Sequence, residues 1–401
     1  MAPAGNFECL QAAIQGGADS VYFGVGRLNM RSHSANNFAI EDLSEVCRIC
    51  RKAGVRTYLT LNIVLYGEDL APMRETLDEA RRAGVDAVIA SDMAAILYAR
   101  SIGMEVHIST QLSISNVESL RFYAQWADVV VLARELRLEQ VAEISRTLEA
   151  EGIKGPSGRN VQIEMFCHGA LCMAISGKCY LSLHQYNASA NRGECFQLCR
   201  RAYEVKDIET GMQLKIDNKY IMSPKDLCTV RFLDKMAAAG CTVFKIEGRA
   251  RSAEYVKTVT QAYREAADAI EAGTFSELKA SELYTRLETV FNRGFWDGYY
   301  QGALLGEWSE VYGNRATRTK TYIGRITNWY SRLGVAEITV ETGGFRLGDH
   351  LLITGSTTGV MECDVKEIRT DHQVQEAKKG DVCSIPLVER PHRGDRVYLY
   401  Q

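Results

Sequence analysis

The sequence predicts an α/β protein that ends in a small all-β domain. Short apolar strands alternate with amphipathic helices from the first residues to Gly248, apart from one long interruption that contains clustered cysteines. From about Thr321 onward the pattern changes to strands separated by glycine turns. Strand–helix alternation is typical of a parallel sheet, whereas many short strands with glycine turns are typical of an all-β barrel or sandwich.

The strands of the first part are nearly continuously apolar, as expected for parallel strands that are buried on both faces. Helical patterns lie between them, such as residues 40–54 and 71–84, which end in Gly54 and Gly84 as expected C-caps. An eight-stranded TIM-like (β/α) barrel needs one more strand, just before residue 2, so we expect either a trimmed start or a neighbouring segment in that gap. A doubly wound open sheet is the alternative, although no glycine-rich phosphate fingerprint follows the early strands. The seven expected strands are 20–24, 56–64, 86–91, 105–110, 128–133, 161–166 and 241–248.

The patterns divide the chain into three parts. Residues 1–308 form the expected TIM-like barrel domain, which carries a cysteine-rich insertion at about 167–226. Residues 309–319 are the expected linker, and residues 320–401 the small all-β barrel. The insertion follows the C-terminal end of a strand, the face on which barrel enzymes build their active sites, and loops of this length are usually functional.

Composition argues against several classes of protein. The formal net charge of −3 gives no bulk reason for indiscriminate binding to nucleic acid, although a local basic patch is compatible with it. No run approaches the ~18 apolar residues that span a bilayer, and the start MAPAGNFECLQ lacks the regions of a secretory signal. Twelve cysteines without a signal peptide indicate a reducing compartment, so we expect a cytoplasmic protein with no membrane partner.

Four cysteines gather in the insertion, and thiolates favour iron–sulfur clusters, zinc and copper(I). Only Cys195 and Cys199 have the close spacing of a zinc pair, and a scattered set of four suits a cubane cluster better. We therefore expect a [4Fe–4S] cluster, with zinc or free structural thiols as alternatives. Cys167 and Cys228 flank the set, and either could replace one member. The expected ligands are Cys172, Cys179, Cys195 and Cys199.

Polar side chains follow the predicted strands, and in a barrel they converge on one mouth as a default substrate site. His168 and Glu247 are the candidate catalytic residues, although His168 could equally support the cysteine loop. Glu247 could pair with Arg249, or both could bind an anionic substrate. No H-E-x-x-H or G-x-S-x-G motif occurs, and Cys167 beside His168 is a poor dyad because neighbours on a strand point in opposite directions. The candidate substrate-binding residues are Arg31, Asn62, Gln111, Arg134, Lys245 and Arg249.

Several long motifs together resemble the peptidase U-32 family, whose members have been labelled collagenase-like proteases. The resemblance runs from APAGNFE at 2–8 to the linker near Tyr312. It passes through LNMRSHSANNF, STQLSISN, HGALCMAISGKCYLS, NRGECFQLCR, MSPKDLC, FKIEGRARSAEYV and FNRGFWDGYY. The C-terminal barrel looks like the module of the family's RNA-modifying members and like domain two of translation elongation factors.

The resemblance implies oxygen-independent hydroxylation. One group of relatives forms 5-hydroxyuridine at the tRNA wobble position, another hydroxylates 23S ribosomal RNA, and a third acts in anaerobic ubiquinone synthesis with a [4Fe–4S] cluster; prephenate is implicated as the oxygen source. The four expected ligands match the family's cluster-binding pattern, and Cys228 stays in reserve because that position is variable. The ubiquinone group lacks a β-barrel of this kind, which favours the RNA branch.

The resemblance therefore predicts an iron–sulfur-dependent, prephenate-dependent hydroxylase of a tRNA base, with tRNA and a small carboxylate as partners. A homo-oligomer, or a hetero-oligomer with a paralogue, is compatible with it. The alternatives are a U-32 peptidase and a non-catalytic RNA-binding protein with a structural metal. One departure concerns residues 209–227, which are more compact than the matching segment of the RNA-modifying relatives. This leaves the identity of the RNA open.

Overall fold

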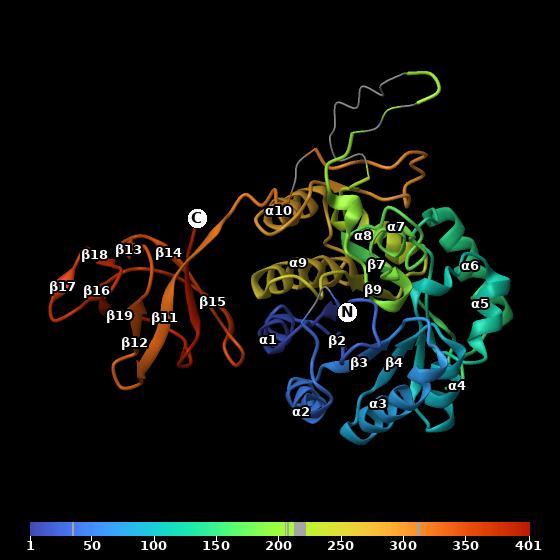
Figure 1. Cartoon of the computed structure of the whole chain (residues 1–401), viewed down its shortest axis with the longest axis horizontal. Coiled ribbons are helices and arrows are strands. Elements are labelled where there is room, and N and C mark those ends of the chain that lie inside the picture. Colours follow the sequence, from blue (N-terminus) through green and yellow to red (C-terminus); the bar gives the residue numbers. More distant parts are fainter. Residues whose placement is uncertain (34–35, 205, 207, 212–221, 311–312) are drawn as a thin grey trace.

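The computed structural model describes residues 1–33, 36–204, 206, 208–211, 222–310 and 313–401. A ring of strands surrounded by helices forms one part of the molecule, and a smaller part built from strands packs beside it (Figure 1). The compact segment noted above falls largely on 212–221, which lies outside the described residues, as do two positions of the expected linker, 311–312. No helix within the described ranges is both long and apolar enough to cross a membrane.

Eight parallel strands form the TIM-like barrel, which confirms the fold predicted from the alternation. The first strand, β1 (Ala2–Pro3), pairs with β2, and the main chain of Met1 closes the ring by bonding to Phe244 O at 2.8 Å and to the Ile246 amide at 3.1 Å. Residues 1–3 thus occupy the position for which the sequence showed no strand, because two residues are too few to display a period. The other barrel strands are β2 (Ser20–Gly24), β3 (Arg56–Leu61), β4 (Ala87–Ala90), β5 (Glu105–Ile108), β6 (Val129–Val131), β7 (Gln162–Ala170) and β9 (Val243–Ile246).

The helices lie outside the ring and begin and end where the sequence chemistry indicates. The Asp92 carboxylate accepts from the Ala94 amide and the Asn116 side chain from the Ser119 amide, each at 2.9 Å, so both residues act as N-caps. Gly84 ends its helix with φ of 83°, the left-handed conformation that favours glycine. The outer helices are α1 (Phe7–Gln15), α2 (Leu43–Lys52), α3 (Leu70–Ala83), α4 (Met93–Ser101), α5 (Val117–Ala124), α6 (Leu138–Glu151), α8 (Leu233–Ala238), α9 (Ala253–Glu271) and α10 (Glu277–Glu288).

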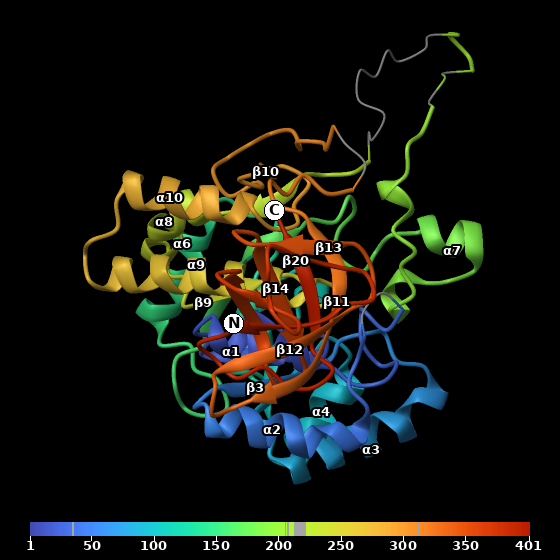
Figure 2. The ribbon, with the colours of Figure 1, turned by 90° about the vertical axis from the view of Figure 1, so that its left-hand side faces the viewer.

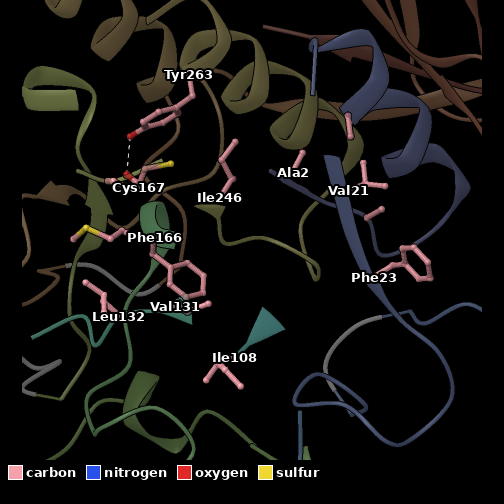
Figure 3. Packing of buried hydrophobic residues seen from close by; sticks show 14 of the residues in the cluster. Ala2, Val21, Phe23, Ile108, Val131, Leu132, Phe166, Cys167, Ile246 and Tyr263 are labelled. Carbon is pink, nitrogen blue, oxygen red and sulfur yellow. Dashed lines mark hydrogen bonds between the residues drawn. The ribbon is translucent and has the colours of Figure 1, made fainter. Parts of the chain in front are cut away.

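The hydrophobic core lies between the strands and these helices, and Figure 3 shows part of it. Cys47 and Cys50 of α2 are buried there, so their C-x-x-C spacing reflects helical packing. The hydroxyl of Tyr263 on α9 donates to Cys167 O at 2.8 Å, which ties this helix to β7 (Figure 3). A buried phenol needs such a partner, because an unpaired one would carry the cost of desolvation.

The cysteine-rich insertion leaves the barrel at the end of β7 and contains α7 (Leu181–Tyr186). It returns through β8 (Asp226–Cys228), which runs antiparallel to β7 and also pairs with β10 (Phe295–Trp296). Arg200 joins the two ends of the insertion, since its guanidinium donates to Leu171 O at 2.7 Å and to Pro224 O at 2.6 Å. A few side chains therefore position a long irregular segment over the barrel mouth.

The smaller part is an antiparallel all-β structure that packs along α1 (Figures 1 and 2). Alternate residues of β12 are buried, as expected of a strand with one face on a core. The Gln15 side chain bonds to Thr358 O and to the Val360 amide, each at 2.9 Å, which joins the two parts. The strands of the curled sheet, in spatial order, are β15 (Gly359–Asp364), β14 (His350–Gly355), β20 (Arg396–Tyr400), β11 (Lys320–Tyr330), β12 (Val335–Val340), β19 (Val382–Pro386), β16 (Ile368–Arg369) and β17 (Gln373–Val374), with β13 (Gly344–Arg346) and β18 (Glu376–Lys378) as a separate pair.

Candidate functional site

A cavity of about 200 Å³, here called the inner cavity, opens where the barrel strands end and the insertion covers them. The C-terminal ends of parallel strands are where barrel enzymes place their active sites. The structure brings all six predicted substrate-binding residues into the wall of this one cavity. They are Arg31, Asn62, Gln111, Arg134, Lys245 and Arg249.

The wall of the inner cavity is strongly basic. Its lining holds seven lysine or arginine residues and one carboxylate, Glu247. An excess of this size in a partly enclosed site favours a ligand with several negative charges, since low-dielectric walls strengthen the attraction. Sequence reasoning missed three of the seven: Arg200 and Arg293 follow no predicted strand end, and Arg251 lies two positions beyond the predicted Arg249. The seven are Arg31, Arg134, Arg200, Lys245, Arg249, Arg251 and Arg293.

Glu247 pairs with Arg31 rather than with Arg249. Its Oε1 lies 2.7 Å from Nη2 of Arg31, while Arg249 donates to Asn29 and Thr60 instead. Burial by itself raises the pKa of the Glu247 carboxyl, but Arg31 and the neighbouring arginines outweigh it and lower that pKa to about 2. Glu247 is thus an ionised carboxylate at neutral pH, which holds Arg31 in place and has no proton to donate.

Lys245 forms a second buried pair at the floor of the cavity. Its Nζ lies 2.6 Å from Oε1 of Glu164, and both side chains are almost fully buried. The ring centroids of Tyr22 and Phe166 lie 4.8 Å and 5.3 Å from Nζ of Lys245. Burial lowers the pKa of Lys245, and Glu164 opposes that shift. Glu164 was missed in the sequence, although a carboxylate inside an apolar strand is itself a signal of a buried partner.

Arg134 presents an unsatisfied donor in this region. Its guanidinium stacks on Phe166 with 3.6 Å between Cζ and the ring centroid, and one terminal nitrogen donates to Ala170 O at 2.9 Å. The Nε of Arg134 is buried and has no hydrogen-bond partner among the described residues. Buried donors are normally satisfied, so this one is a natural position for a ligand oxygen.

The four predicted cluster ligands, all in the insertion, line the same inner cavity. Cys172 is exposed and the other three thiols are half-buried. Burial raises the pKa of Cys199 to about 11, and Arg200 beside it opposes the shift. Within the described ranges, however, no three cysteine, histidine or acidic side chains stand close enough to hold a metal ion as they are placed. The four thiols are donors of the kind that a cluster needs and line one cavity, but they are not assembled around one point, so the cluster assignment stays a prediction.

The remaining candidates lie away from the cavity. His168 packs against Phe295 with ring centroids 5.4 Å apart, and its Nδ1 lies 3.3 Å from the Tyr263 hydroxyl. Burial lowers the pKa of His168 to about 3, so the imidazole is neutral. Cys167 and Cys228 are buried beside the same tyrosine, and neither of them is among the residues that line the inner cavity. These placements give no support to a catalytic role for His168 or to ligation by the two reserve cysteines.

Comparison with known proteins places this site in a family. The sequence model described as peptidase family U32 matches residues 5–310. This chain belongs to peptidase family U32. The match spans the barrel and the insertion, and therefore every residue that lines the inner cavity.

Relatives within the family carry two kinds of name. The chain is 56% identical over 401 residues to a protein of Porphyromonas gingivalis named collagenase. This alignment covers 100% of this chain and 97% of that protein. It is 33% identical over 337 residues to a tRNA hydroxylation protein of Bacillus subtilis, covering 82% of this chain and 77% of that one. It is 35% identical over 314 residues to a 23S rRNA 5-hydroxycytidine synthase of Escherichia coli, covering 77% and 46%. These relatives are named for two different activities, proteolysis and RNA hydroxylation. The names alone therefore do not assign an activity to this chain.

Proposed function

We propose that this protein is an enzyme that hydroxylates a base of tRNA without molecular oxygen. In this proposal Cys172, Cys179, Cys195 and Cys199 hold a [4Fe–4S] cluster, the reaction forms 5-hydroxyuridine at the wobble position, and a small carboxylate such as prephenate donates the oxygen atom. The observation that carries it is the inner cavity, where seven basic side chains and four thiols surround one space with a single carboxylate. Two relatives named for RNA hydroxylation support it.

The basic residues would bind and orient the oxygen donor. Guanidinium groups bind carboxylates through paired hydrogen bonds, and the buried, unpartnered Nε of Arg134 would supply one donor of such a pair. Arg31 is held by Glu247, and Arg249 by Asn29 and Thr60, so both arrive pre-positioned. A wall that is fixed before the ligand enters loses little side-chain entropy on binding.

The reaction is a two-electron exchange. The carbon–hydrogen bond of the base and the carbon–oxygen bond of the donor break, while a carbon–oxygen bond forms on the base and a carbon–hydrogen bond on the donor. The base is oxidised by two electrons and the donor is reduced by two. A cluster bound by the four thiolates would supply electron transfer or polarise the donor oxygen. Lys245 and Glu164 form a buried pair beside this space that can hold a proton at Nζ.

The peptidase alternative rests on the name of the more similar relative. A serine or cysteine peptidase needs a nucleophile with a base in reach. No histidine occurs among the described residues that line the inner cavity, and Lys245 and Glu247 are each engaged in an ion pair. An activated nucleophile is therefore not assembled here, which favours hydroxylation.

Deletion of the gene tests the proposal. We expect mass spectrometry of digested tRNA to show loss of the hydroxylated uridine, restored by the wild-type gene and by Cys363→Ala but not by Cys195→Ala. Cys363 is a half-buried thiol of the all-β part and serves as the matched control. A folded but inactive Cys195→Ala protein excludes the scaffold alternative, which predicts unfolding instead.

Three outcomes contradict the proposal. One is unchanged hydroxylation in the deletion strain. Another is an anaerobically purified protein that contains zinc but neither iron nor labile sulfide. The third is cleavage of denatured collagen by the pure protein that a single nucleophile substitution abolishes.

A further inference from the structure

A second, more open cavity of about 580 Å³ adjoins the inner cavity, and we call it the outer cavity. The two share part of their walls, so a ligand that occupies one of them reaches the edge of the other. The residues that line both cavities are Cys195, Gln197, Arg200, Arg251 and Arg293.

The outer cavity carries an uncompensated positive charge. Arg200, Arg201, Arg251 and Arg293 line it, and its described lining contains no carboxylate. Arg293 pairs with Asp226 at 3.1 Å, whereas the other three make no ion pair with any described residue. Arg200 is satisfied by main-chain oxygens, and Arg251 stacks on Phe291 with 3.6 Å between Cζ and the ring centroid. Guanidinium groups held in this way keep their charge available to phosphate.

Exposed aromatic rings stand beside these arginines. Phe196 is 40% exposed and Tyr186 of α7 is 44% exposed, with ring centroids 5.0 Å apart. The ring centroids of His33 and Phe196 are 4.4 Å apart in a tilted arrangement, and Arg201 donates to the Tyr186 hydroxyl at 3.0 Å. Rings that stay in water beside a basic groove are what single-stranded nucleic acid uses for base stacking.

We propose that the outer cavity binds single-stranded RNA next to the base that enters the inner cavity. Arg200, Arg201 and Arg251 contact phosphates of the strand, and Phe196 with Tyr186 stacks on a neighbouring base. This inference rests on the proposed function, since the base that reacts is the one that passes the shared wall. A strand carries one phosphate and one flat base per nucleotide, which matches a site that offers guanidinium groups and rings side by side.

Binding of a fluorescent anticodon stem-loop RNA, followed by anisotropy over a series of salt concentrations, tests the inference. We expect Phe196→Leu to weaken binding by about 10-fold, because the ring face is lost while apolar volume is kept. Arg201→Gln should weaken binding and reduce the slope of log affinity against log salt by about 0.7, the value for one phosphate contact on a single strand. Both side chains are on the surface, so thermal melting of the variants should match the wild type.

Two matched controls separate this site from general charge and hydrophobicity. Phe122→Leu removes a 53%-exposed ring from α5, and Arg332→Gln removes an exposed positive charge from the turn after β11. Both should bind RNA as the wild type does. The inference is overturned if Phe196→Leu and Arg201→Gln also bind like the wild type, or if they lose affinity for a labelled denatured-collagen peptide and not for RNA.

The assay measures binding without turnover, so its failure differs from failure of the proposed function. If both variants bind RNA with the affinity of the wild type, the proposal that the outer cavity binds RNA is refuted, and the hydroxylase proposal is unaffected. If hydroxylation is normal in the deletion strain and the variants bind RNA more weakly, the hydroxylase proposal is refuted. The proposal that the outer cavity is an RNA site is then retained.

Discussion

An ion pair at the barrel mouth and an ion pair on the all-β part differ in how far they are buried. Lys245 and Glu164 are 5% and 0% exposed, whereas the Arg325–Glu341 pair of the all-β sheet is 55% and 31% exposed at a similar N–O distance of 2.5 Å against 2.6 Å. The buried pair is desolvated and depends on its partner, while water already solvates the exposed pair. The ion pair at the barrel mouth is therefore held at a desolvation cost that the exposed pair of the all-β sheet does not carry.

The largest effect should come from breaking the buried pair. Glu164→Gln leaves the Lys245 ammonium without a counter-charge in a desolvated position, so we expect a loss of about 3–5 kcal/mol in unfolding free energy. Urea unfolding measures it. Glu341→Gln, the matched change on the surface, should leave the unfolding midpoint unchanged. If the two substitutions lowered the unfolding free energy equally, the difference drawn between the buried and the exposed ion pair would be wrong.

A second test concerns the Arg200 guanidinium, which donates hydrogen bonds to main-chain oxygens and forms no ion pair with a carboxylate in the described ranges. Arg200→Lys keeps the charge but loses the fork that bonds to Leu171 O and Pro224 O, so we expect a loss of about 2–3 kcal/mol, because hydrogen bonds to charged groups are the stronger ones. The cysteine-rich insertion should then be cut sooner in limited proteolysis. Arg201→Lys is the neighbouring control, and it should be cut at the wild-type rate.

A third test concerns a buried group that is neutral rather than paired. The pKa of His168 is lowered to about 3 by burial, from 6.5 in the unfolded chain. The unfolded state therefore binds a proton first, and the stability from His168 is complete above pH 6.5 and is lost as pH falls toward 3. We expect a contribution of up to about 1.4 kcal/mol per pH unit in this window. His168→Phe should flatten the pH dependence of unfolding, whereas His372→Asn in an exposed turn should not.

The smallest effect is expected at the boundary between the two regions. Gln15 bonds to Thr358 O and to the Val360 amide, so Gln15→Ala should cost about 1 kcal/mol and loosen the contact. Hydrogen exchange at the Val360 amide should become faster. Gln125→Ala, at the exposed end of α5, is the control and should leave it unchanged. Unchanged exchange in Gln15→Ala would show that other contacts hold the two parts together.

The sequence predicted the elements well and the site in part. Strand 20–24 was predicted with the bounds of β2, and the six predicted substrate-binding residues, which lie near or beyond the carboxyl ends of strands, all line the inner cavity, because these strand ends meet at one face. Strand β1 was missed because two residues show no period. Arg200 and Arg293 were missed because they reach the cavity from segments remote from the predicted strand ends, and Arg251 because it lies two positions beyond Arg249, where nothing in the local sequence shows which side chain turns inward.

The sequence by itself determined the barrel, its cysteine-rich insertion and the all-β part, since local periodicity of apolar residues specifies strands and helices and their order specifies how they pack. Only the tertiary structure decided which charges meet. Arg31 and Glu247 are 216 positions apart, and nothing in either segment names the other as its partner. Burial and neighbouring charges together then set the protonation of each group, because both depend on what surrounds a side chain in space and not on its neighbours along the chain.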